Sequence, residues 1–157
     1  MAYAEDTAVS VEKSKAEIEK LLLRHGADQF VSGHESGRAM VQFRKDGRFV
    51  RFVLTLPDPK EKRFHQTPSG KWSVPAERAH KLWEQACRAK WRALCLCIKA
   101  KLEAVAASIT TFETEFMPHT VMPDGKTFAQ HALPAIAKAY ETGKIPQLLT
   151  FEGEKRP

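Results

Sequence analysis

The chain has 157 residues, of which 43% are hydrophobic and 28% are charged, which matches one ordinary domain with its own buried core. Three cysteines in apolar surroundings argue against a secretory disulfide framework, and no apolar run reaches the length of a membrane span. The acidic amino terminus lacks the apolar stretch of a signal peptide, so we expect a cytoplasmic protein without membrane contact.

The net charge of +6 is distributed unevenly along the sequence. Residues 1–37 carry −3 and residues 102–157 carry −2, whereas residues 38–101 hold 16 Lys and Arg against five Asp and Glu, a net +11. A concentrated positive charge attracts polyanions, although the solvated surface of a small protein can have the same composition. Both interpretations stay open from the sequence.

The amino-terminal part predicts a helix and a first strand. Residues 10–25 place apolar side chains at helical spacing among Glu and Lys, and Gly26 stands where such a helix would end. Residues 29–32 then predict a short strand, with the polar stretch 33–37 as its turn. A three-stranded antiparallel meander follows from this order.

The next hairpin is the clearest local signal. Strands over residues 38–45 and 48–56 flank Asp46-Gly47, a pair that favours a type I′ turn. With those two residues as the loop, one face is apolar and must meet the core: Ala39, Val41, Phe43, Val50, Phe52 and Leu54. The opposite face is basic with apolar members: Arg38, Met40, Gln42, Arg44, Phe49, Arg51, Val53 and Thr55.

Residues 57–73 predict a long irregular connection that carries Lys62, Arg63 and Lys71. Pro75 then opens the longest element, a helix that continues toward Met117 or breaks near residues 108–111.

On a helical wheel, Lys81, Arg88, Arg92 and Lys99 lie together, away from the apolar stripe of that helix. They form either a basic binding ridge or a solvated face.

The carboxyl-terminal part predicts a helical extension. Thr127 and Gln130 fit a capping box at its start, and Gly143 fits its end. We expect Pro134 to break or restart this segment. The domain is expected to span residues 1–150, followed by a frayed tail over 151–157.

The sequence contains no recognisable catalytic or metal-binding pattern. It lacks the glycine-rich phosphate-binding motifs and the paired histidines of zinc sites. Cys95 and Cys97 point in opposite directions on a helix, so we interpret them and Cys87 as buried packing residues. We therefore expect neither an enzyme nor a cofactor.

Four segments resemble a family of small phage and prophage proteins that has no settled activity: Trp91-Arg-Ala-Leu94, Ile98-Lys-Ala-Lys-Leu-Glu-Ala-Val105, Phe112-Glu-x-Glu-Phe116 and Val121-x-Pro-Asp-Gly125. The early Gly26-Ala and the Arg48-x-Val-Arg-Phe52 strand fit the same pattern, so the resemblance spans most of the chain. It implies a phage or mobile-element setting in a bacterial host cell and transfers no functional residue.

The order of elements predicts an α+β fold: an α-β-β-β-α core in which a three-stranded antiparallel sheet packs on a long helix, plus the carboxyl-terminal helical extension. Double-stranded-RNA-binding domains and, loosely, the core of strand-annealing proteins share this order, at the level of fold only.

We expect a non-enzymatic nucleic-acid-binding accessory protein, acting on single-stranded DNA in replication or recombination. The predicted binding residues are Arg38, Arg44, Phe49, Arg51, Lys62, Arg63, Lys71, Lys81, Arg88 and Arg92. The alternative is a protein-binding module that sequesters or inhibits a host factor through an acidic surface of that factor. A homo-oligomer is compatible with both, joined through the apolar side of the long helix: Leu82, Ala89, Ala93, Leu96 and Ala100.

Overall fold

The computed structural model describes residues 4–146. It confirms the predicted α+β class, with a three-stranded antiparallel sheet in the order β1-β2-β3. The elements in chain order are α1 (Val11–Arg24), β1 (Gln29–Glu35), β2 (Arg38–Lys45), β3 (Arg48–Thr55), α2 (Lys62–His65), α3 (Ala76–Ala106), α4 (Phe112–Phe116), the 3₁₀ helix η1 (Met117–His119) and α5 (Phe128–Thr142). The tail predicted over 151–157 lies outside the described residues, and the domain bounds stay a prediction.

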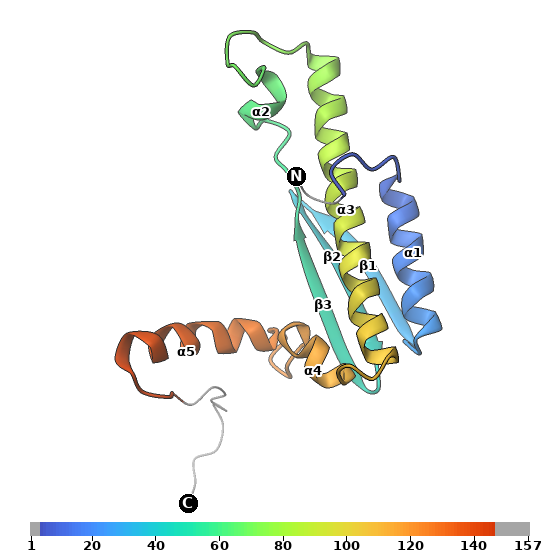
Figure 1. Cartoon of the computed structure of the whole chain (residues 1–157), viewed down its shortest axis with the longest axis vertical. Coiled ribbons are helices and arrows are strands. Elements are labelled where there is room, and N and C mark those ends of the chain that lie inside the picture. Colours follow the sequence, from blue (N-terminus) through green and yellow to red (C-terminus); the bar gives the residue numbers. More distant parts are fainter. Residues whose placement is uncertain (1–3, 147–157) are drawn as a thin grey trace, which may run out of the picture.

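Two layers make up the body of the molecule. Helices α1 and α3 lie side by side on one face of the sheet (Figure 1). Their buried side chains, among them Ile18 and Leu22 of α1 and Trp91 and Ile98 of α3, join the apolar side chains of β2 and β3 in a single core cluster. Within residues 4–146, every helix is too short or too polar to span a membrane.

The second hairpin has the register that its turn predicts. Phe43 pairs with Val50, and Val41 pairs with Phe52. Asp46 and Gly47 both have positive φ angles, 51° and 74°, as a type I′ turn requires. The prediction for this hairpin is confirmed.

The first hairpin differs from the prediction. Strand β1 continues to Glu35, so the stretch 33–37 is not the turn. Ser36 and Gly37 alone make the turn, with φ angles of 26° and 78°. The polar composition of residues 32–35 hid this continuation because both sides of this edge strand are largely exposed and show no apolar alternation.

The longest helix breaks instead of reaching Met117. Helix α3 ends at Ala106, and Ser108 has a positive φ of 56°, which turns the chain back toward the sheet. The next helix, α4, and η1 then run beside β3, where Thr120 pairs with Val50. Of the two alternatives left open by the sequence, the broken helix is the one observed.

Two further expectations are wrong. The connection after β3 contains a short helix, α2, whose Phe64 is buried against α3. Pro134 neither breaks nor restarts α5 but lies inside it, on the exposed side. The capping box of Thr127 and Gln130 and the left-handed Gly143 at the end of α5 are confirmed.

The cysteines divide into two kinds. Cys87 and Cys95 are buried, and burial raises the pKa of the Cys95 thiol to about 11, so both act as packing residues. Cys97 is exposed, so the packing interpretation is wrong for this residue.

Ser14 is a buried hydroxyl without a partner. It lies on the buried side of α1, and its Oγ has no hydrogen-bond partner among the described residues. We expect Ser14→Ala to raise the free energy of unfolding by about 1 kcal/mol, since a desolvated, unpaired hydroxyl is removed. Urea denaturation measures this change.

Ser10 provides the matched control, because its Oγ accepts a hydrogen bond from Lys13 N at 3.1 Å and caps the same helix. Ser10→Ala is expected to lower the free energy of unfolding by about 1 kcal/mol. A loss of stability in Ser14→Ala would contradict the assignment of an unpaired hydroxyl.

Candidate nucleic-acid interface

The outer face is the face of the sheet that points away from α1 and α3. Every second residue of each strand lies on it, and residues paired across the three strands form rows of side chains. Gln29, Arg44 and Phe49 form one row, and Val31, Gln42 and Arg51 form the next. The complete outer face contains Gln29, Val31, Gly33, Glu35, Arg38, Met40, Gln42, Arg44, Phe49, Arg51, Val53 and Thr55.

Large apolar side chains of the outer face are open to solvent. The exposed fraction is 60% for Val53, 55% for Val31 and 38% for Phe49. Together with the half-buried Met40, the two valines form an apolar centre between the arginines. An isolated exposed valine needs no explanation, but a cluster on a regular sheet surface indicates a contact surface.

The arginines of the outer face are held in place by neighbouring groups. Arg44 binds the Asp28 carboxylate through two nitrogens, at 2.7 and 2.9 Å, and the same contact lowers the pKa of Asp28. The Arg44 guanidinium also lies 6.0 Å from the centre of the Phe49 ring. Arg44 and Phe49 therefore form one ordered cationic and aromatic pair.

Arg51 and Arg38 differ in their support. Arg51 donates to Gln42 Oε1 and to the Gly125 carbonyl, both at 2.9 Å, which attaches the loop before α5 to the rim of the outer face. Arg38 is exposed and makes no ion pair within residues 4–146. The outer face thus combines two positioned guanidinium groups with one that is free to follow a ligand.

The three predicted cations of α3 lie on the helix that packs against the inner face of the sheet. Lys81 pairs with Glu77 at 2.8 Å, and Arg92 pairs with Glu17 of α1. Arg88 donates to Gln85 Oε1. Since α3 covers the inner face of the sheet, the structure separates these residues from Arg38, Arg44 and Arg51 (Figure 1).

The cations of the connection after β3 form a third group. Lys62 and Arg63 belong to α2, which packs on α3, and Arg63 pairs with Glu61 at 2.6 Å. Lys71 is exposed in the loop that follows. The ten predicted residues therefore do not form one surface, and four of them, Arg38, Arg44, Phe49 and Arg51, share the outer face.

Sequence reasoning missed the contribution of β1 to the outer face. Val31 lies beside Gln42, and Glu35 lies beside Arg38, only because β1 continues past Ser32. The Gly125 carbonyl, which accepts a hydrogen bond from Arg51, is 74 residues from it in the sequence, so no local sequence pattern indicates this contact. A longer first strand would have revealed Val31 as the apolar partner of Met40 and Val53.

The structure was also searched for metal-ligand groups and the sequence for relatives. Within residues 4–146, no group of three His, Cys, Asp or Glu side chains could hold a metal ion. A scan against protein-family models and searches of curated proteins and of solved structures found no match. The resemblance to small phage and prophage proteins stays a prediction.

Proposed function

We propose that this chain is a non-enzymatic accessory protein that binds single-stranded nucleic acid across the outer face. The observation that supports this function most is the open row arrangement of Arg38, Arg44 and Arg51 around exposed apolar side chains and Phe49. The guanidinium N–H groups that the contacts with Asp28, Gln42 and Gly125 leave unused suit phosphate groups, and the apolar centre suits the flat faces of bases.

The dimensions of the outer face favour a single strand over a duplex. Neighbouring strands lie about 4.8 Å apart, so the platform is about 10 Å wide from the axis of β1 to the axis of β3. One extended strand of nucleic acid can place its bases on Val31, Met40 and Val53 while its phosphates meet the arginines at either end. A duplex would present its phosphates to this apolar centre and leave it without a partner.

The setting that we propose is the cytoplasm of a bacterial host cell, with the protein encoded by a phage or prophage and acting on DNA in replication or recombination. This part rests on the sequence resemblance and on the basic central region of the chain. The binding mechanism itself requires only charge neutralisation and limited stacking.

Fluorescence anisotropy tests the function with labelled single-stranded and duplex DNA and RNA, titrated at several salt concentrations. Wild type is expected to bind single strands more tightly than duplexes at low salt. Arg44→Ala/Arg51→Ala should weaken single-strand binding by about tenfold or more, since two positioned phosphate contacts are lost. An absence of binding at low salt would overturn the proposal.

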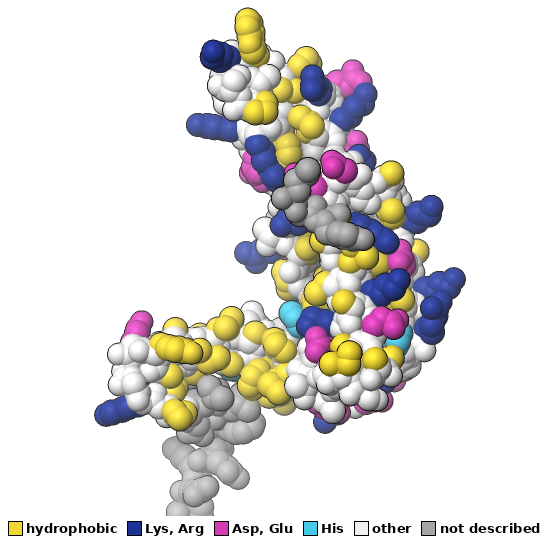
Figure 2. Space-filling view, in the orientation of Figure 1, with side chains coloured by type: hydrophobic (Ala, Val, Ile, Leu, Met, Phe, Trp, Pro, Cys, Tyr) yellow, Lys and Arg dark blue, Asp and Glu magenta, His cyan; other side chains and the backbone are white. Residues whose placement is uncertain are grey.

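A protein-binding module is the second candidate, favoured by the exposed apolar side of α5. Leu133, Ile136 and Tyr140 are 62%, 43% and 89% exposed, and hydrophobic side chains gather along this helix (Figure 2). Helix α5 also extends sideways, away from the sheet (Figure 1). Co-purification with one stoichiometric host protein, lost in Ile136→Asp/Tyr140→Asp, would favour this candidate.

The apolar side of α3 proposed for self-association is only partly covered. Leu82, Ala93 and Ala100 are exposed, whereas Ala89 and Leu96 are half-buried. The oligomeric state stays a prediction, and light scattering of the purified protein measures it directly.

A further inference from the structure

The long helix outspans the sheet and leaves a crevice beneath it. Helix α3 has 31 residues, about 46 Å, whereas each strand of the second hairpin has eight, about 27 Å. The amino-terminal half of α3 therefore projects past the end of the sheet (Figure 1). Below it lies a crevice of about 620 Å³, a volume typical of small-molecule sites.

One part of the crevice wall is apolar. Val11 of α1, Leu56 at the end of β3, and Trp83 of α3 contribute to it. The indole of Trp83 is half-buried and fixed in place, because its Nε1 donates to the Pro57 carbonyl at 2.9 Å. A fixed indole edge among aliphatic side chains suits a flat aromatic ligand.

The polar groups of the crevice carry both signs of charge. Lys15 and Arg88 are donors, and Glu12 and Glu84 are acceptors, so the formal charges of these four side chains cancel. Ser10 and His34 add further hydrogen-bonding groups to the lining. Such a set disfavours a phosphate chain inside the crevice. It suits a neutral planar ring whose edge carries both hydrogen-bond donors and acceptors, which is the chemistry of a nucleobase.

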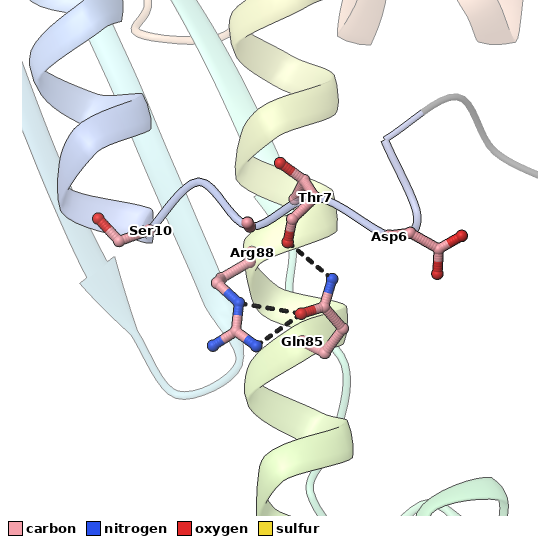
Figure 3. Close-up of a pocket in the computed structure, with 6 residues that line it drawn as sticks. Asp6, Thr7, Ser10, Gln85 and Arg88 are labelled. Atoms are coloured by element: carbon pink, nitrogen blue, oxygen red, sulfur yellow. Dashed lines mark hydrogen bonds between the residues drawn. The ribbon is translucent and has the colours of Figure 1, made fainter.

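Arg88 lies between this crevice and a second hollow. The second hollow has a volume of about 600 Å³ and is also lined by Thr7, Ser10 and Gln85. Figure 3 shows the guanidinium directed at Gln85, whose Oε1 accepts from Arg88 Nε and Nη2 at 3.1 and 2.6 Å. Gln85 in turn donates to the Thr7 carbonyl at 2.9 Å, so Arg88 is a positioned cation at the rim.

The crevice reaches the end of the sheet, beside the turn between β1 and β2. Gly37 and Leu56 line it and close the sheet there, with Leu56 N donating to the Gly37 carbonyl at 2.8 Å. The next residue, Arg38, belongs to the outer face, where it lies beside Thr55. A nucleic-acid strand bound to Arg38 thus needs to extend only past Gly37 and Leu56 for one base to reach the crevice.

We propose that the crevice binds one unpaired nucleobase, with Arg88 at its rim next to the attached phosphate. The part of this inference that takes the base from a bound strand rests on the proposed function of the outer face. Such a site would favour single strands, because a base in a duplex is paired and stacked and cannot enter without being extruded.

The test follows the indole N–H signals of Trp83 and Trp91 by NMR in a Trp72→Phe background, which removes the third, exposed tryptophan. The probes are thymidine monophosphate, deoxyribose phosphate, oligothymidylate and the same oligomer without bases. The two base-containing probes should shift the Trp83 signal saturably, whereas the two probes that lack bases should leave it unchanged.

Substitutions separate the crevice from the outer face. Arg88→Ala should weaken thymidine monophosphate binding by about tenfold, and Lys99→Ala, an exposed cation of the same helix, should not. Arg44→Ala/Arg51→Ala should keep the response to thymidine monophosphate while losing oligothymidylate. If only thymidine monophosphate shifts the Trp83 signal of the wild-type protein, the base does not come from a bound strand. If neither thymidine monophosphate nor oligothymidylate shifts it, the crevice is not a base site.

Discussion

Phe116→Ala is expected to lower the free energy of unfolding by about 3–5 kcal/mol, the cost of a large cavity in a packed core. Phe116 is fully buried, and its ring packs edge-on against Phe43 and Phe52, with centroid distances of 5.8 and 6.3 Å. These contacts attach the segment after α3 to the sheet. Denaturant unfolding monitored by circular dichroism measures the change.

Phe49→Ala is the matched control, because Phe49 lies on the outer face of the same sheet and is 38% exposed. Its removal should lower the free energy of unfolding by only about 1–2 kcal/mol, since part of the ring already faces water and no enclosed cavity is left. Similar losses for both variants would contradict the assignment of Phe116 to the core and Phe49 to the surface.

Removing the three arginines of the outer face is expected to have the largest effect on binding. Each contact with a phosphate in single-stranded nucleic acid contributes about 0.7 to the slope of log affinity against log salt. Arg38→Ala/Arg44→Ala/Arg51→Ala should therefore reduce that slope by about 2 and weaken binding at low salt by about a hundredfold. Anisotropy titrations over a range of salt concentrations measure both quantities.

A control with the same loss of charge is available on α3. Lys81, Lys90 and Lys99 are exposed residues of α3, the helix that packs on the sheet from the side opposite the outer face. Their replacement by alanine should lower affinity only slightly, through the net charge, and should leave the salt slope nearly unchanged. Equal slopes for the two triple variants would indicate nonspecific attraction instead of a defined outer face.

The elements that could be predicted from sequence are those with strong local signals. Asp46-Gly47 determines both the turn and the register of the second hairpin, because a two-residue loop pairs Phe43 with Val50 and Val41 with Phe52 and so places these core residues on one face. Thr127 and Gln130 likewise mark the start of α5 through a capping box, a contact within four residues. Tertiary structure does not alter either feature.

The features that were missed depend on contacts distant in sequence. Ser108 is one of several weak helix formers, and the position of the break follows from the packing of Phe112 and Phe116 on the sheet. Pro134 is tolerated inside α5 because this side of the helix is exposed and the freed Gln130 carbonyl can meet water. Local propensity alone predicts a break there.

The candidate site could be predicted in part for the same reason. Alternation within β2 and β3 identified Arg38, Arg44, Phe49 and Arg51 as one face, as the register shows. Grouping these residues with Lys81, Arg88 and Arg92 rested on closeness in sequence and shared charge. Helix α3 packs on the inner face of the sheet, so its cations lie apart from the outer face, and binding by either group stays a prediction.

The most direct test of the outer face is an NMR titration of the isotope-labelled protein with a short oligothymidylate, following the backbone amides of all three strands. The largest shifts are predicted at Val31, Met40, Arg51 and Val53. Little change is predicted at Ala93 and Ala100, which are exposed on α3. Shifts concentrated on α3, or none at saturating oligonucleotide, would contradict binding across the outer face.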